Sequence, residues 1–152
     1  TVLTQEGEKI VLTKDELELS YRQSIIAKKG YFVLSSRFEL EKGNQQEIDE
    51  KIADLTFKRE SKQPLEYPSA GSVFKRPPGY FAGKLIQDSG LQGKGVGDAE
   101  VSTKHAGFII NKGNATATDY IETINLVQRV VKEKFNVDLE LEVKIVGEDL
   151  TK

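Results

Sequence analysis

A serine and a lysine three residues apart, Ser72 and Lys75, lie in a segment that reads YPSAGSVFKRPPG from residue 67 to residue 79. This spacing suits an acyl-transferring enzyme in which the lysine activates the serine, provided that both lie on one turn of a helix. Pro77 and Pro78 follow directly and would interrupt such a helix. The sequence also lacks the companion motifs S-D-N and K-T-G. The pattern therefore disfavours covalent acylation.

A serine can also donate a proton to a carbon that has just become carbanionic, a role that depends on position more than on nucleophilicity. Such a site must stabilise the developing enolate, and an arginine and a carboxylate near the same carbon would serve. The candidates are Arg22, in SYRQS, and Glu142, in the alternating segment near the C-terminus. Taken alone, each is more simply interpreted as a solvated strand residue. A triad of Ser72, His105 and an acid is neither supported nor excluded by spacing, and a lone histidine in a strand is ordinarily structural or solvent-facing.

Basic side chains gather near this serine in the sequence. Their positions are Arg59, Lys62, Lys75 and Arg76. They could hold a diphosphate or a carboxylate, because the glycine in the same segment lets a ligand approach the backbone closely. The alternative is a solvated basic edge, which composition alone favours. The GKGVGD stretch at residues 93–98 matches neither the dinucleotide nor the triphosphate loop, so we expect a turn-rich connection there.

The composition limits the classes of protein to consider. A chain of 152 residues suits one ordinary domain, or one compact domain with a piece of another. Because 22 Lys and Arg stand against 24 Asp and Glu, no general attraction to nucleic acid or to an anionic membrane is expected. The chain has no cysteine and one histidine, so no metal site is predicted. A cytoplasmic location fits the lack of cysteine and of any spanning or signal pattern.

Short strands and one long helix are expected in the first part of the chain. Strands are expected at residues 9–12 and 31–40, where β-branched and aromatic residues gather. The helix is expected to run from Asn44 to just before Pro64. Its apolar stripe would consist of Ile48, Ile52 and Leu55.

The remaining segments mix helices and strands without a regular period. We expect a short helix at 80–90, a strand at 99–111, a long helix capped by Thr118, and an alternating strand at 138–147. The stripe of the long helix would be Ile121, Ile124, Val127, Val131 and Phe135. This mixture favours an α+β fold, with a mixed or antiparallel sheet and packed helices, over a doubly wound sheet.

Six motifs follow the order found in one flavoenzyme family. They are YRQS at 21–24, KQP at 62–64, AGSVFK at 70–75, AGKLIQDSGLQG at 82–93, HAGFIIN at 105–111 and LELEVKIVG at 139–147. The chain thus resembles the UDP-N-acetylenolpyruvoylglucosamine reductase (MurB) family, also called UDP-N-acetylmuramate dehydrogenase. The resemblance covers nearly the whole chain.

The resemblance implies a cytoplasmic oxidoreductase of peptidoglycan synthesis, which serves cell wall biogenesis, cell shape and cell division. In the family, NADPH reduces FAD, and hydride then passes from the flavin to the enolpyruvyl group of UDP-N-acetylglucosamine enolpyruvate. A proton follows, and the product is UDP-N-acetylmuramate. Neither nucleic acid nor a membrane is an implied partner.

The resemblance also implies roles for single residues. Ser72 matches the general acid that protonates the substrate carbon, and Arg22 and Glu142 match the pair that stabilises the enol intermediate. Arg59 resembles a basic residue near the flavin. The implied substrate contacts are Tyr21, Lys62, Lys75, Arg76, His105 and Asn111.

Three positions depart from the family pattern. Arg76 stands where asparagine is frequent, which could reshape sugar recognition. Leu141 stands where proline is frequent. Lys144 stands where arginine is frequent, and it keeps the charge but loses the planar fork of a guanidinium.

The family's glycine-rich FAD-binding segment is absent upstream of YRQS, and the chain contains no methionine. We therefore expect a C-terminal part of the enzyme, with residues 1–45 as a remnant of the FAD-binding domain and residues 46–150 as the UDP-sugar substrate-binding domain. The missing N-terminal FAD-binding domain would be its partner, and the chain alone is expected to be inactive. The alternative is an isolated UDP-sugar binding module without catalysis. The short interval between Arg22 and Ser72 resembles the shorter family type common in Gram-positive bacteria.

Overall fold

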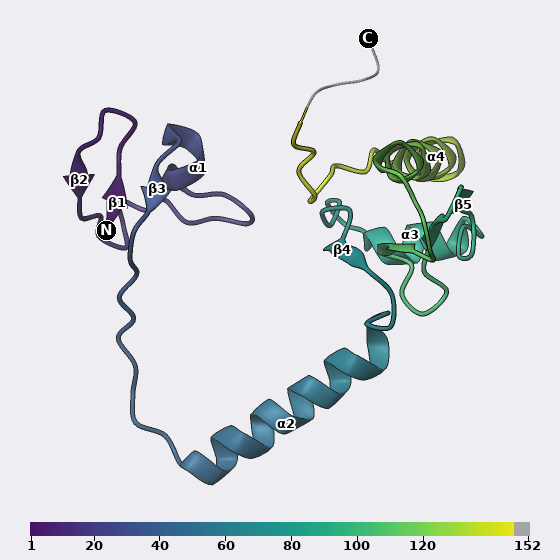
Figure 1. Ribbon diagram of the computed structural model, residues 1–152. Coiled ribbons are helices and arrows are strands. Elements are labelled where there is room, and N and C mark those ends of the chain that lie inside the picture. The colour runs from purple at the N-terminus through teal and green to yellow at the C-terminus, as the bar shows by residue number, and fades with distance from the viewer. Residues whose placement is uncertain (148–152) are drawn as a thin grey trace. The chain divides into compact units, whose positions relative to one another are not determined.

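The computed structural model describes residues 1–147, and the chain forms two compact units, Thr1–Asn44 and Gln45–Lys152 (Figure 1). The expected end of the second domain at residue 150 lies outside the described residues. The assignment of the units to FAD binding and substrate binding stays a prediction. Among residues 1–147, no helix is long and apolar enough to cross a membrane.

The first unit contains a small antiparallel sheet in the order β2-β1-β3 and one short helix. Its elements are β1 (Val2–Leu3), β2 (Lys9–Ile10), α1 (Ile25–Lys29) and β3 (Phe32–Val33). The expected strands at 9–12 and 31–40 are therefore too long, since only two residues of each pair with a neighbour. A strand extends only as far as a partner supplies hydrogen bonds, and residues 36–44 have no regular structure.

The first unit buries little apolar surface. Val2, 3% exposed, is its only fully buried apolar side chain among the described residues. Its exposed large apolar side chains are Val11, Leu19, Tyr21, Phe32, Val33, Leu34, Phe38 and Leu40. A unit of this size without a core has little stability of its own.

The second unit begins with α2 (Gln45–Lys62), and the predicted helix between Asn44 and Pro64 is confirmed. None of its side chains is buried, including the predicted apolar stripe. Contacts between side chains one turn apart support the helix instead. The pairs are Gln45 with Asp49, Gln46 with Glu50, and Lys58 with Asp54.

A four-stranded antiparallel sheet and two helices complete the second unit (Figure 1). The strands, in the order β4-β7-β6-β5, are β4 (Ser69–Ser72), β5 (Gly95–Val96), β6 (Ala99–Val101) and β7 (Phe108–Asn111). The helices are α3 (Ala82–Asp88) and α4 (Ala117–Phe135), and α4 packs on β5, β6 and α3. These elements confirm the predicted α+β class with antiparallel sheets.

The predicted strand at 99–111 is wrong, because these residues form two antiparallel strands, β6 and β7, joined by a turn. The hydroxyl of Ser102 accepts hydrogen bonds from the backbone of Lys104 and His105 and so stabilises the turn. The stretch at 93–98 is likewise more than a connection, since it contains β5 and the turn into β6.

The N-cap of the long helix α4 lies two residues before the predicted cap, Thr118. Thr116 is the N-cap, and it exchanges hydrogen bonds with Asp119 in a capping box. The buried face consists of Thr123, Ile124, Val127 and Val131. The outer members of the predicted stripe are not buried: Ile121 is half-buried and Phe135 is exposed.

Tyr120 carries a polar atom into the packed side of α4. Its hydroxyl oxygen is buried and has no hydrogen-bond partner among the described residues, and burial raises the pKa of the phenol above its usual value of 10.0. The pKa of Tyr120 is therefore higher in the folded chain than in the unfolded one, and the phenol favours the folded state by its full amount below about pH 10. As the pH rises further, the unfolded chain loses this proton first, so the free energy of unfolding falls.

We expect Tyr120→Phe to leave the free energy of unfolding at pH 7 unchanged or to raise it by up to about 1 kcal/mol, because no hydrogen bond is lost. The variant should also lose less stability than the parent between about pH 9 and pH 11. Urea unfolding across this range measures both effects. Tyr80→Phe, at an exposed tyrosine, is the matched control, and an equal response in the two variants would contradict the assignment.

Candidate functional site

Ser72 is the last residue of β4 and lies opposite Phe108 of β7, after a break in the strand register. Gly71 has a φ of +81°, and a Cβ there would meet open space, so the glycine is needed for its backbone conformation rather than for room. Ser72 is exposed, whereas Val73 behind it is completely buried. The serine hydroxyl thus lies at the surface on a firmly anchored strand end.

The segment that carries Glu142 runs beside the residues that follow Ser72. The backbone N–H of Glu142 donates to the carbonyl of Val73 at 2.8 Å, and that of Lys75 donates to the carbonyl of Glu140 at 2.8 Å. The structure therefore brings the backbones of Ser72 and Glu142 together from sequence positions 70 apart.

The predicted strand at 138–147 is reduced to a single antiparallel bridge between Phe74 and Leu141. Its alternation is partly confirmed, because Leu139 is buried and Leu141 and Val143 pack against the core, whereas Ile145 is 61% exposed. Glu142 was expected to be a solvated strand residue, but its Oε2 is buried. One carboxylate oxygen of Glu142 is thus held out of water, unlike the side chain of the exposed Glu140.

Arg22 and Tyr21 belong to the first unit. Arg22 has a φ of +56°, and its guanidinium lies 5.9 Å from the centroid of the exposed Tyr21 ring. A positive φ at a residue other than glycine costs free energy and often marks a functional position. The proposed meeting of Arg22 with Ser72 and Glu142 stays a prediction.

The basic residues near Ser72 have weak, exposed partners. Lys75 forms an ion pair with Glu140 at 3.1 Å. The Arg76 guanidinium stacks 3.9 Å from the centroid of the Phe81 ring, and its Nε donates to the carbonyl of Tyr80 at 3.1 Å. Exposed ion pairs contribute little free energy, so a phosphate ligand would compete for these cations at small cost.

The other two predicted basic residues lie in the last turn of α2. The Nε of Arg59 donates to Oε1 of Gln63 at 3.3 Å, and Lys62 is exposed. Their predicted roles, toward a flavin for Arg59 and toward a UDP phosphate or sugar for Lys62, stay predictions.

His105 is held in one tautomer. Its Nδ1 accepts a hydrogen bond from the backbone N–H of Gly107 at 3.1 Å, so the neutral ring carries its proton on Nε2. In a serine triad the histidine Nδ1 must be protonated and Nε2 must accept the proton from serine. The arrangement therefore disfavours the triad with Ser72 and leaves Nε2–H as a donor.

Asn111 has a structural task that the sequence analysis missed. Its Oδ1 accepts hydrogen bonds from the backbone of Gly113 at 2.9 Å and of Ala115 at 3.1 Å. The side chain thereby shapes the turn into α4. Only its amide NH₂ is left for the predicted contact with a uridine, and that contact stays a prediction.

The structure of residues 1–147 contains no group of three or more histidine, aspartate and glutamate side chains that could hold a metal ion. Two residues of this region were not predicted from the sequence: Glu140, the partner of Lys75, and Ser102, the anchor of the His105 turn. A serine within a polar segment was the available signal for Ser102.

The chain has clear relatives. A profile described as UDP-N-acetylenolpyruvoylglucosamine reductase, C-terminal domain, matches residues 63–146. A protein named UDP-N-acetylenolpyruvoylglucosamine reductase from Geobacillus thermodenitrificans is 68% identical over 148 residues, which are 97% of this chain and 49% of the relative. One of the same name from Oceanobacillus iheyensis is 65% identical over 97% of this chain and 48% of its own.

Solved structures agree with these relatives. The crystal structure of UDP-N-acetylenolpyruvylglucosamine reductase (MurB) from Thermus caldophilus matches with a TM-score of 0.74 and 35% sequence identity. The match covers 93% of this chain and 50% of that chain. The chain therefore spans about half the length of the relatives that it matches.

Proposed function

Because the chain belongs to the UDP-N-acetylenolpyruvoylglucosamine reductase family, we propose that it is the C-terminal part of a cytoplasmic enzyme of peptidoglycan precursor synthesis. The reaction is the NADPH-dependent reduction of UDP-N-acetylglucosamine enolpyruvate to UDP-N-acetylmuramate. FAD, when bound, supplies the hydride. The relatives of this name and the share of their length that the chain covers support the proposal.

We infer that the first unit alone does not hold FAD. Its one fully buried apolar side chain among the described residues is Val2, and large side chains such as Phe32, Phe38 and Leu40 are exposed. A flavin ring needs an enclosing, largely apolar site. We therefore assign FAD binding mainly to the missing N-terminal domain, which would also cover these exposed side chains.

Within this chain, the proposed chemistry centres on proton delivery. Ser72 donates its hydroxyl proton to the substrate carbon, and Glu142, with Arg22 from the first unit, stabilises the enol form. The observation that supports this assignment is the backbone hydrogen bond from Glu142 to Val73, the residue after Ser72, because it brings the two chain segments side by side. Lys62, Lys75, Arg76 and the Nε2–H of His105 are the proposed contacts to the UDP part of the substrate.

The alternative function is a UDP-sugar binding module without catalysis, and one titration bears on both. We expect UDP at millimolar concentration to shift the backbone amide signals of Lys62, Lys75 and Arg76 in the ¹⁵N-labelled 152-residue chain. The amide of Val127, on the buried face of α4, serves as the reference that should not move. The absence of shifts in the 62–76 segment would count against both forms of the proposal.

The same sample separates the binding module from the complete enzyme. We expect no flavin at a stoichiometric level in the purified chain, because the first unit lacks an enclosing apolar site. A stoichiometric flavin spectrum would contradict the assignment of FAD binding to the missing domain.

A further inference from the structure

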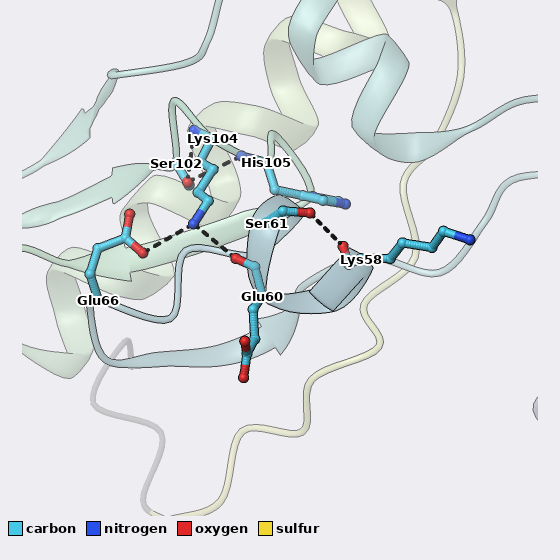
Figure 2. Close-up of polar contacts among 7 residues, drawn as sticks. All are labelled: Lys58, Glu60, Ser61, Glu66, Ser102, Lys104 and His105. Atoms are coloured by element: carbon cyan, nitrogen blue, oxygen red, sulfur yellow. Dashed lines mark hydrogen bonds and ion pairs between the residues drawn. The ribbon is translucent and has the colours of Figure 1, made fainter. Parts of the chain in front are cut away.

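A lysine outside the predicted site connects two of its parts. Lys104 lies in the turn between β6 and β7, directly before His105. Its Nζ donates to the backbone carbonyl of Glu60 at 3.1 Å and lies 3.5 Å from Oε2 of Glu66. Figure 2 shows this one ammonium group contacting both sides of the bend that follows α2.

The carbonyl of Glu60 belongs to the last turn of α2, where the final four carbonyls have no partner within the helix. A cation at this position satisfies one such carbonyl and meets the negative end of the helix dipole. No side chain of α2 is buried, and the first fully buried side chain after it is Pro64, two residues beyond the helix. Lys104 therefore restrains a helix turn that has no buried side chain of its own.

The turn that carries Lys104 is itself well anchored. The hydroxyl of Ser102, whose residue is 1% exposed, accepts from the backbone of Lys104 at 3.2 Å and of His105 at 3.3 Å. The side chain of Gln92 donates to the carbonyl of Thr103 at 2.6 Å. One buried hydroxyl thus fixes both the lysine that reaches α2 and the adjoining histidine.

We propose that Lys104 is a positioning residue for substrate binding. It holds the last turn of α2, which carries Arg59 and Lys62, at a fixed position relative to the turn that carries His105. This inference rests on the proposed function. Glu60, whose carbonyl accepts from Lys104, lies between Arg59 and Lys62 in the chain. A ligand that contacts Lys62 and His105 together binds more tightly when the two segments are already fixed, because less motion is lost on binding.

The first test measures the restraint itself, in the 152-residue chain. Lys104→Met keeps the apolar stem and removes the charge, and it should speed amide hydrogen exchange at Gln63, which donates to the carbonyl of Arg59, by roughly 5- to 10-fold. Lys104→Arg should stay within about 2-fold of the parent, since a guanidinium can contact the same oxygens. The matched control is Lys112→Met, at a lysine paired with Glu100 at 3.2 Å on the sheet, and it should have no effect at Gln63.

The second test measures UDP affinity in the same four proteins by NMR titration. We expect Lys104→Met to weaken UDP binding by roughly 3- to 10-fold, with Lys104→Arg restoring it to within about 2-fold. Unchanged exchange at Gln63 in Lys104→Met would overturn the restraint, and faster exchange with unchanged UDP affinity would overturn the positioning role. If the parent chain binds no UDP, the proposed function fails and the positioning role with it, while the exchange data still decide whether the restraint exists.

Discussion

Replacing Ser72 by alanine is expected to slow substrate reduction by roughly 100- to 10,000-fold in a protein that joins this chain to an N-terminal flavin-binding half, the range typical of a lost general acid. Reduction of the flavin by NADPH should stay nearly intact, because that half of the reaction needs no proton from the serine. Stopped-flow absorbance measures the two half-reactions separately. The expected pattern is a slow reoxidation by UDP-N-acetylglucosamine enolpyruvate after a normal reduction.

The exposed position of Ser72 separates an effect on catalysis from an effect on folding. The serine is exposed at the end of β4, so the loss of one hydroxyl should leave the fold intact. Ser69→Ala removes the same group from the other, also exposed, end of the same strand and is the matched control. Rapid reoxidation in Ser72→Ala, or equal slowing in Ser69→Ala, would remove Ser72 from the proposed role.

Replacing Gly95 by alanine is expected to lower the free energy of unfolding of the second unit by about 3 kcal/mol. A Cβ at this position would collide with the carbonyl oxygen of Ala99 and lie 2.8 Å from the Cα of Glu100. These are backbone atoms of the paired strand β6, which cannot move aside as a flexible side chain could. Displacing β5 would also break the hydrogen bond from the backbone of Val96 to the buried hydroxyl of Thr123, at 3.0 Å.

Urea unfolding followed by circular dichroism measures this loss. The matched control is Gly90→Ala, where φ is +72° and a Cβ would meet open space, so that only the backbone conformation is penalised, by about 1 kcal/mol. A difference of less than about 1 kcal/mol between the two variants would show that β5 yields to the extra methyl group.

Local signals predicted the helices well. The spacing of Ile48, Ile52 and Leu55 placed α2 correctly, although their exposure could not be predicted, because a helical period does not reveal whether a partner covers the stripe. For α4 the period was correct but the cap was not, since Thr116 and Thr118 are both good capping residues and only Thr116 pairs with Asp119.

Strand pairing was the main failure of the sequence analysis, because it depends on partners far apart in the chain. Residues 99–111 carry strand-forming residues throughout, and only the contacts of Ser102 show where the chain turns. In the candidate site, Ser72 and Glu142 were named from chemistry and resemblance, and the pairing of their segments is found only in the structure. The contact of Lys104 with Glu60, 44 residues away, could not be predicted from any local sequence pattern.

We propose that this chain supplies the substrate-binding and proton-donating half of a reductase. The most direct test joins the chain to the N-terminal half of the Geobacillus thermodenitrificans relative, which is 68% identical to this chain where they overlap, and measures NADPH-dependent conversion of UDP-N-acetylglucosamine enolpyruvate. We predict a protein with bound flavin that forms UDP-N-acetylmuramate at a rate comparable with that of the relative. A folded protein that binds flavin and oxidises NADPH, but forms no UDP-N-acetylmuramate, would contradict the claim.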